Sequence, residues 1–471
     1  MIFSSILFLM YYLPSILLVY LIAPKRMRNF ILLVGSLFFY AWGEPVYVGI
    51  MIFSIVSDYF HGKKIGDLLQ AGRLKKAKYF LLSSIVINLL LLGFFKYVDF
   101  ILQIVNEIFN KNIPLMQLPL PIGISFYTFQ TMSYTIDIYR GKAKAQKNIV
   151  TFGAFVTMFP QLIAGPIVKY QEIEEQLQAR RTNKEDLEYG IRRFVTGLGK
   201  KVLLANGIGQ LWDIVQGMGV SQMTVLMAWM GILAFSFQIY FDFSGYSDMA
   251  IGLGRIFGFT FPENFNYPYI ANSVTDFWRR WHISLSSWFK EYVYIPLGGN
   301  RVGIKRQIIN LIIVWSLTGI WHGASWNFLL WGMWFAFFLI LEKLWLLQWI
   351  EKRKRVVQRG YALGVIIIGW VIFTLNNMGE IFNYLCYLFG ISEVSLWNRE
   401  SLYLLSNFTI IFILCLIGAT PVSKRCFIAI KRRMGTILFS IVESIVILWI
   451  FLLSMAYIVD ASYNPFLYFR F

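Results

Sequence analysis

The sequence predicts an all-α polytopic membrane protein, and two observations support this class. Of the 471 residues, 58% are hydrophobic and only 14% are charged, whereas a soluble globular chain carries about 25% charged residues. The apolar residues also gather in long blocks, and the segments 1–23, 148–168, 214–241 and 307–341 contain no Asp, Glu, Lys or Arg. Because roughly 20 predominantly apolar residues cross a bilayer as a helix, blocks of this length predict membrane spans.

The first apolar block, 1–23, could be a cleavable secretory signal or a retained helix. It lacks the basic start and the small-residue cleavage site of a signal peptide, and Tyr11, Tyr12 and Pro14 interrupt it. Further apolar segments follow at once. We therefore expect a first helix that stays in the protein.

Clusters of Lys and Arg separate the apolar blocks and predict the orientation of the chain. Loops on the cytoplasmic side are rich in these residues, so the net charge of +18 is interpreted as orientation rather than as binding of nucleic acid or another polyanion. With the clusters inside, the N-terminus lies outside, and helices are expected at 3–22, 30–43, 46–60, 79–100 and 120–138. The clusters lie at 25–28, 63–78, 140–147, 180–201, 301–306, 352–359 and 424–433.

The segment 149–168 conflicts with simple alternation of the spans. If it crossed outward, the basic cluster 180–201 would lie on the wrong side of the membrane. Pro160, Gly165 and Pro166 interrupt the segment, and broken backbone at membrane depth is tolerated only where protein buries it or where it lines a cavity. We therefore predict a re-entrant element, with a single kinked span and a basic outer loop as the alternative.

The C-terminal half contains further apolar segments and one insert of different composition. Spans are expected near 202–220, 223–241, 307–321, 324–345, 360–377, 404–422 and 435–459. The segment 241–306 is rich in aromatic residues, Gly, Pro and charge, and it is expected to be a cytoplasmic or re-entrant insert that carries function. The tail 460–471 is expected on the extracytoplasmic side, and 1–471 is expected to form a single membrane domain.

Three histidines occur, and His322 is the strongest candidate for chemistry. It lies near the middle of the uncharged block 307–341, where an ionisable side chain is costly and is a functional candidate by default. Desolvation there would keep the imidazole neutral, as a general base requires. Gly319 and Gly323 beside it would permit a helix break or the close approach of a substrate. The alternative is a histidine that only makes a hydrogen bond between helices.

The second histidine of interest, His282, lies in the aromatic segment 275–289. If this segment is one helix, several side chains share a face: Trp278, Trp281, His282, Leu285, Trp288 and Phe289. One interpretation is an amphipathic helix at the lipid surface whose histidine reaches toward the headgroups. The other is a gate helix that offers a second imidazole, with Arg279 and Arg280 able to bind phosphates.

The remaining candidates predict neither a metal nor a nucleotide site. His61 precedes Gly62 and two lysines, so we expect it at a helix end near terminal carbonyls, in a structural role. Cys386, Cys415 and Cys426 form no spacing motif, and no metal-ligand spacing, Gly-rich nucleotide loop or G-x-S-x-G motif is present. This inventory permits acyl transfer that depends on histidine and needs no metal.

Six sequence blocks, in order along nearly the whole chain, resemble the membrane-bound O-acyltransferase (MBOAT) family, and specifically its bacterial alginate O-acetyltransferase (AlgI-like) branch. The blocks are PIGISFYTF (121–129), YTIDIYR (134–140), FPQLIAGP (159–166), YFDFSGYSDMA (240–250), FWRRWH (277–282) and WHG (321–323). Several long blocks in the same order are far more specific than an isolated W-H-G.

The resemblance implies a fold of roughly 11–13 transmembrane or re-entrant helices around a central tunnel. It implies that His322 is the invariant catalytic histidine and that His282 is the second polar position of the site. It also implies acetyl-coenzyme A as a cytoplasmic donor substrate, with no bound cofactor, and the bacterial cytoplasmic membrane as the location. Cations of the insert, first of all Arg279, Arg280 and Lys290, would hold the coenzyme A phosphates.

The same resemblance implies an extracytoplasmic polysaccharide such as alginate, cellulose or peptidoglycan as the final acceptor, within exopolysaccharide or cell-envelope biosynthesis. A separate SGNH-type esterase or transferase would complete the transfer as a partner. Relatives carry a tyrosine near the C-terminus, and Tyr468 is expected to accept the acyl group with His322 as base and to pass it outward. A phenol has a pKa near 10 and needs such a base to act as a nucleophile. The alternative is that Tyr468 is an aromatic interfacial anchor.

Three other functions are alternatives to this one. The teichoic-acid D-alanylation branch uses an aminoacyl carrier protein, but its members tend to be shorter and receive the tail relay from another chain. A transporter without chemistry would share the broken helices and deep polar residues, yet the chain has no detectable inverted repeat and few buried acids. A purely structural scaffold would tolerate substitution of His322.

Overall fold

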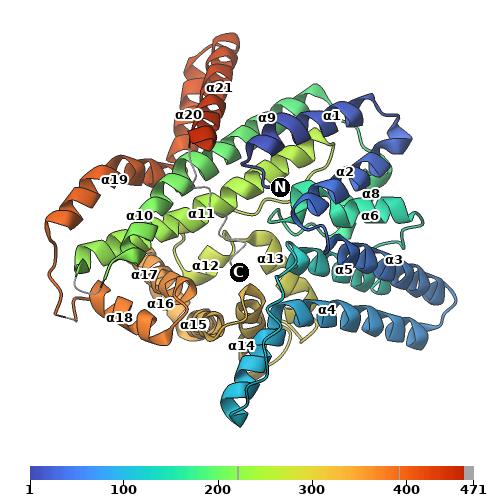
Figure 1. Cartoon of the computed structure of the whole chain (residues 1–471), viewed down its shortest axis with the longest axis horizontal. Helices are drawn as coiled ribbons and strands as arrows, with labels where there is room; N and C mark the ends of the chain where they lie inside the picture. The colour runs from blue at the N-terminus through green and yellow to red at the C-terminus, as the bar shows by residue number, and fades with distance from the viewer. Residues whose placement is uncertain (220–221, 392, 461–471) are drawn as a thin grey trace. The chain divides into compact units, whose positions relative to one another are not determined.

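The computed structural model describes residues 1–219, 222–391 and 393–460, and these ranges contain helices and no strands (Figure 1). Six of the helices are long and apolar enough to cross a membrane, so the predicted all-α polytopic class is confirmed. The chain packs as two compact units, one formed by Met1–Phe194 with Ser247–Pro262 and the other by Val195–Tyr246 with Glu263–Phe471. We describe each unit separately, and the expectation of a single domain stays a prediction.

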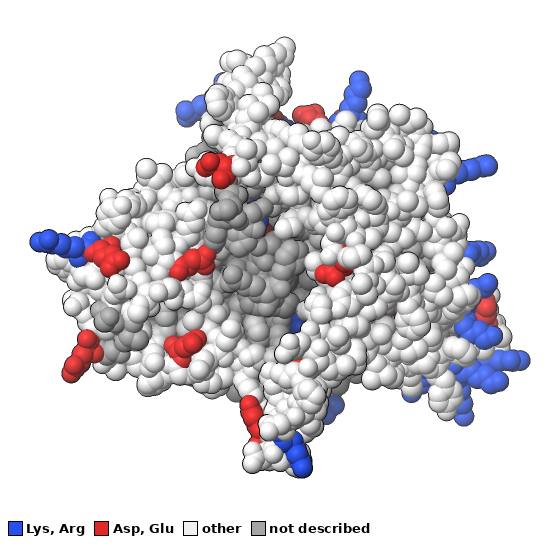
Figure 2. All heavy atoms as spheres, viewed as in Figure 1, with Lys and Arg blue, Asp and Glu red and all other residues white. Residues whose placement is uncertain are grey.

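The first unit contains the N-terminal helices. They are η1 Leu7–Tyr12, α1 Leu13–Ile22, α2 Arg28–Gly43, α3 Val48–Gln70, α4 Leu74–Phe109, α5 Ile124–Tyr139, α6 Ile149–Thr157, α7 Phe159–Leu162 and α8 Tyr170–Gln178. With 36 residues, α4 is about 54 Å long, so it extends well beyond the apolar core of a bilayer. Lys and Arg side chains gather at the turn between α3 and α4 (Figure 2). This pattern agrees with a loop in water at the start of α4, which is one of the six helices able to cross a membrane.

The predicted break within 149–168 is confirmed. Helix α6 ends at Thr157, Met158 leaves the helical region, and the short α7 follows. Side chains satisfy the interrupted backbone, because Gln161 Nε2 donates to the Phe155 carbonyl at 2.6 Å and the Phe159 N–H donates to Ser36 Oγ at 3.1 Å. Residues 151–168 are all buried in protein, as broken backbone at membrane depth requires. Whether it returns to the cytoplasmic side stays a prediction.

The expectation that His61 sits at a helix end is wrong. Helix α3 continues through the basic residues to Gln70, so His61 lies inside it. Its two ring nitrogens contact the Ser57 carbonyl at 2.7 Å and Ser83 Oγ on α4 at 2.8 Å. These contacts join α3 to α4, which supports the structural role expected for this histidine.

The second unit contains the helices that follow α9 (Lys184–Gly199), and α9 and α11 each run from one unit into the other. Its elements are η3 Lys200–Ala205, α10 Asn206–Gly217, α11 Val225–Ile256, α12 Val274–Trp278, α13 Ile283–Phe289, η6 Lys290–Tyr294, α14 Ile304–His322, α15 Trp326–Leu341, η7 Glu342–Leu346, α16 Leu347–Glu351, α17 Arg355–Thr374, α18 Met378–Leu388, α19 Arg399–Gly418, α20 Val422–Arg433 and α21 Thr436–Asp460. Helices lie at all the spans predicted in this half, and five of them are long and apolar enough to cross a membrane: α11, α15 with its continuation to Glu351, α17, α19 and α21. Helices α10 and α14, at the predicted spans 202–220 and 307–321, are not among these, and the sequence did not predict α18 and α20.

The expected end of a helix at 241 is wrong, because α11 runs on to Ile256. The charged residues that suggested an end are paired within the protein. Asp242 Oδ1 lies 2.7 Å from Lys201 Nζ in the second unit, and both side chains are nearly fully buried. Asp248 Oδ1 lies 2.7 Å from Arg193 in the first unit. Since pairing offsets the cost of burying these charges, the helix need not stop, and the irregular part of the insert begins only after Ile256.

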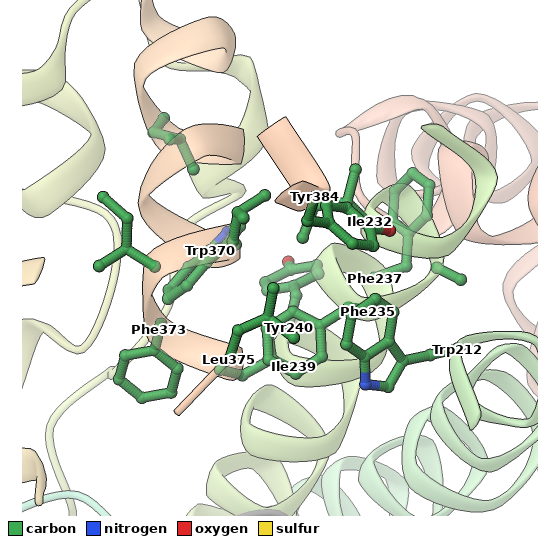
Figure 3. Packing of buried hydrophobic residues seen from close by; sticks show 14 of the residues in the cluster. Trp212, Ile232, Phe235, Phe237, Ile239, Tyr240, Trp370, Phe373, Leu375 and Tyr384 are labelled. Carbon is green, nitrogen blue, oxygen red and sulfur yellow. The ribbon is translucent and has the colours of Figure 1, made fainter. Parts of the chain in front are cut away.

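A core of aromatic and aliphatic side chains fills the second unit. Figure 3 shows Trp370 and Phe373 of α17, Tyr240 and Phe235 of α11, and Trp212 of α10 within it. Rings of this size bury large areas and prefer tilted or edge-to-face contacts. The segment before His282 and the helix after His322 also contribute rings to this core, so both histidines are held by a rigid surrounding.

Candidate active site

His322 is the last residue of α14, and the chain leaves the helix at Gly323. Helices α14 and α15 pack closely because glycines face each other where they cross. A Cβ atom on Gly319 would collide with the Phe328 carbonyl, and one on Gly332 would collide with the Trp315 carbonyl. Small residues allow such approach of helix backbones. Gly319 therefore serves helix packing, and the helix break that was one of the two expectations for Gly319 and Gly323 occurs at Gly323.

Aromatic rings enclose the imidazole of His322. Its centroid lies 4.9 Å from Trp331 and 5.3 Å from Phe373, both edge-to-face, and 4.9 Å from Trp321. The residue is only 8% exposed. Phe373 and Trp331 belong to the core, so they hold the ring in place while its remaining edge faces a cavity.

The segment 275–289 is not the single amphipathic helix that its spacing predicts. Helix α12 ends at Trp278, α13 begins at Ile283, and His282 between them adopts φ 45°. A non-glycine residue in this left-handed region carries strain of about 1–3 kcal/mol and is retained where the surroundings impose it. His282 is also only 2% exposed, so it lies inside the protein rather than at a lipid surface.

Asn264 fixes the tautomer of His282. Its Oδ1 accepts from the Ser284 N–H at 3.2 Å and from Ser284 Oγ at 2.9 Å, and it lies 3.2 Å from His282 Nδ1. Because a backbone N–H can only donate, this Asn264 atom is an acceptor, and His282 Nδ1 must carry the proton. Burial lowers the pKa of His282 well below its ordinary value, and the nearby His322 lowers it further. The ring is therefore neutral at pH 7, with Nε2 unprotonated.

A cavity of about 160 Å³ in the second unit brings the two histidines together. His282 and His322 both line it, and Lys290 and Tyr294 of η6 contribute polar groups to its wall. The other lining residues are Trp278, Trp281, Leu285, Ser286, Phe289, Leu311, Val314, Trp315 and Thr318. A mostly apolar cavity with a few convergent polar groups is the usual form of a small-molecule site.

The structure separates the three cations that the sequence groups together. Lys290 lines the cavity. Arg280 Nε instead donates to Asp276 Oδ1 at 2.8 Å, and its guanidinium also reaches the Asn266 carbonyl. Arg279 is exposed and is not part of the cavity wall. Of the three residues, only Lys290 lies where a ligand of this cavity would meet its charge.

Glu342 is a site residue that sequence reasoning missed. Its carboxylate is 2% exposed and accepts from the Val274 and Thr275 N–H groups at 2.7 and 2.8 Å. It thereby satisfies the free donors at the start of α12, the helix that carries Trp278 to the cavity wall. The one sequence feature that could have indicated Glu342 is its position as the first charged residue after the long apolar block 307–341.

Tyr468 and the rest of 461–471 lie outside the described residues, so the structure gives no account of the predicted relay. Within residues 1–219, 222–391 and 393–460, no group of three or more His, Cys, Asp or Glu side chains lies close enough to hold a metal ion.

Comparison with known proteins gives concordant results. The family model described as MBOAT, membrane-bound O-acyltransferase family, matches residues 140–388, which include both histidines of the cavity. The probable alginate O-acetylase AlgI of Azotobacter vinelandii is 36% identical over the whole length of both chains. The peptidoglycan O-acetyltransferase of Helicobacter pylori is 34% identical over 91% of this chain and 88% of its own. The teichoic acid D-alanyltransferase of Bacillus subtilis is 30% identical over 46% of this chain and 57% of its own.

Proposed function

The chain belongs to the membrane-bound O-acyltransferase family and is an acyltransferase, and on this premise we propose that it moves acetyl groups from cytoplasmic acetyl-coenzyme A across the membrane for O-acetylation of an extracytoplasmic polysaccharide. The observation that carries the proposal is the cavity in which His322, His282 and Lys290 meet. The relatives that match most of the chain are named for alginate O-acetylation and peptidoglycan O-acetylation, which supports acetyl as the group transferred and a polysaccharide as the acceptor.

In the proposed chemistry His322 is the general base. Its imidazole removes the proton of an acceptor hydroxyl while that oxygen attacks the thioester carbonyl of acetyl-coenzyme A. A C–O bond forms, the C–S bond breaks, and the coenzyme A thiolate takes the proton back from the His322 imidazolium. The rings around His322 exclude water, which favours transfer over hydrolysis of the thioester.

His282 has a different role in this proposal. Its Nδ1 proton is engaged by Asn264, so its unprotonated Nε2 can only accept a hydrogen bond. A neutral acceptor of this kind can orient an acceptor hydroxyl or the pantetheine amide of the donor. Lys290 at the cavity wall would supply a positive charge for the phosphates of coenzyme A.

The proposal includes a relay through Tyr468. Its phenol would accept the acetyl group from the thioester and release it as an ester to a partner enzyme of the SGNH type on the other face. The two steps are chemically balanced, because the phenol O–H is restored when the acetyl group passes to a hydroxyl of the partner or of the polymer. In this proposal the protein lies in the bacterial cytoplasmic membrane, between a cytoplasmic donor and an extracytoplasmic acceptor.

D-alanyl transfer is the second candidate, because the Bacillus subtilis relative named for it is 30% identical. That match covers less than half of the chain, whereas the acetylase matches cover nearly all of it. A transporter without chemistry has no equivalent support.

The test is a donor comparison in inverted membrane vesicles that contain the protein and a candidate SGNH-type partner. Radiolabelled acetyl-coenzyme A and a D-alanylated carrier protein are supplied separately on the exposed cytoplasmic face, and label on enclosed polysaccharide is measured. We expect label only from acetyl-coenzyme A. Label only from the carrier protein would replace acetyl by D-alanyl transfer, and label from neither would contradict transfer to a polysaccharide.

A further inference from the structure

Two arginines of the first unit lie against one tyrosine ring. The guanidinium carbon of Arg28 is 5.1 Å from the centroid of Tyr20, and that of Arg180 is 5.7 Å from it. Arg180 Nε donates to Tyr20 Oη at 2.8 Å, and its NH1 donates to Asn29 Oδ1 at 2.7 Å. Arg180 also stacks over Phe259 at 4.4 Å. These contacts hold two positive charges close to each other in a fixed arrangement.

Neither arginine has a carboxylate partner in the part of the chain that the structure describes. The Arg28 Nε and Arg180 NH2 atoms are buried there without a hydrogen-bond acceptor, which is costly for charged donors. Burial lowers the pKa of Arg180, and the charge of Arg28 acts in the same direction, against the raising effect of Tyr20. Arg28 as a whole is only partly buried, so an anion can reach its guanidinium from outside.

The local backbone adds to the positive potential. Arg28 is the first residue of α2, a helix of 16 residues with no side-chain cap at its start and no acidic residue in its first turn. The free N–H groups and the dipole of a helix N-terminus attract anions. Lys25 and Arg26 are exposed on the turn just before it. Lys25 and Arg26 thus add positive charge just before a helix start whose first turn contains no acidic residue.

An apolar groove lies beside this cluster. Helices α1 and α2 line it on opposite sides, and its volume is about 510 Å³, within the range of cavities that hold organic ligands. Its wall includes Val19, which is next to Tyr20 in the chain, and Ile31, which lies about one turn of α2 after Arg28, and it extends along η1, α1 and α2 to Tyr11 and Trp42. The flanking side chains Leu18 and Ile22 are exposed apolar residues, as expected of a surface that meets lipid.

We infer that Arg28 and Arg180, with the start of α2, form a binding site for a phosphate group, and that its occupant is an anionic phospholipid whose acyl chain lies in the groove between α1 and α2. The guanidinium of Arg28 contacts the phosphate, since this side chain recognises phosphate oxygens through two parallel hydrogen bonds. Arg180, which also contacts the Tyr20 ring, adds a second positive charge to the site. The site lies in the first unit and makes no use of the histidines of the cavity.

The test uses Arg28→Gln, because Arg28 makes no hydrogen bond to another side chain of the described residues. Its loss removes a contact with the Tyr20 ring, which Arg180 still holds through its hydrogen bond to Tyr20 Oη. Arg26→Gln, on the exposed turn, is the matched control for a change of one charge. The purified full-length protein in detergent is titrated with phosphatidylglycerol, phosphatidylcholine or inorganic phosphate. Bound lipid is counted by native mass spectrometry, and the midpoint of thermal unfolding is recorded.

Wild type and Arg26→Gln are expected to retain phosphatidylglycerol and to unfold at a higher temperature in its presence, with no such effect of phosphatidylcholine. Arg28→Gln is expected to lower the affinity for phosphatidylglycerol about tenfold. Equal retention of both lipids, or retention that Arg28→Gln leaves unchanged, overturns the site. A shift that depends on Arg28 with inorganic phosphate but not with phosphatidylglycerol overturns the lipid as occupant and leaves a phosphate site.

Discussion

Removing the carboxylate of Glu342 tests whether the cavity depends on the anchored start of α12. Its two carboxylate oxygens accept hydrogen bonds from the N–H groups of Val274 and Thr275, with N···O distances of 2.7 and 2.8 Å. Glu342 is 2% exposed. A hydrogen bond to a charged group contributes about 1.5–3 kcal/mol, so Glu342→Ala removes about 3–6 kcal/mol of local stabilisation. Glu342→Gln keeps one carbonyl acceptor and is expected to lose about half of this.

The assay has two measurements on each variant, the rate of acetyl transfer in proteoliposomes and the midpoint of thermal unfolding in detergent. Because α12 carries Trp278 to the cavity and leads to His282, we expect Glu342→Ala to lower the rate by about tenfold or more and Glu342→Gln to be intermediate. Glu351→Ala, at an exposed acid on α16, is the control and is expected to change neither. A Glu342→Ala variant with the wild-type rate and midpoint would refute this reasoning.

Three further predictions follow from particular contacts. Asn264→Ala removes the acceptor of His282 Nδ1 and of Ser284, so the rate of transfer should fall about tenfold and the thermal midpoint should fall as well; an unchanged rate in the folded variant would show that the tautomer is unimportant. Gly319→Val forces α14 away from the Phe328 carbonyl and should destabilise the protein by about 1–3 kcal/mol, whereas Gly364→Ala on α17 meets nothing within 4 Å and should be neutral in the same unfolding assay. Since burial lowers the pKa of His282, the unfolded chain binds a proton that the folded protein does not, so stability should fall as the pH drops below about 6.5. His282→Gln should flatten this part of the pH profile of the thermal midpoint, and a profile with the same slope would contradict it.

Composition and hydropathy were sufficient to predict the membrane class and most of the helices, because apolar blocks of span length have few other uses. The break within 149–168 was also predictable, since Pro160 and Gly165 leave a local signal. Periodicity failed at 275–289, where the strain at His282 depends on contacts with Asn264, which lies outside the segment. Charge failed as a sign of a helix end at 241, because Asp242 pairs with Lys201 across two helices.

The sequence was sufficient to predict the two histidines of the candidate site. It was not sufficient to predict the residues that hold them in place. Depth in an uncharged block singled out His322, and the sequence blocks of the family singled out His282. The roles of Asn264 and Glu342 depend on contacts far apart in the chain, which no spacing pattern encodes. The cations Arg279, Arg280 and Lys290 resemble one another in sequence, and only the fold places Lys290 alone at the cavity.

The central claim is tested most directly by acetyl transfer from radiolabelled acetyl-coenzyme A in proteoliposomes, comparing wild type, His322→Gln and His61→Gln. His61 joins α3 to α4 and does not line the cavity, so His61→Gln is the control for loss of an imidazole outside the site. The account predicts label on an added acceptor with wild type and His61→Gln, and a loss of about 100-fold or more with folded His322→Gln. Label that persists in folded His322→Gln at the wild-type rate would contradict it.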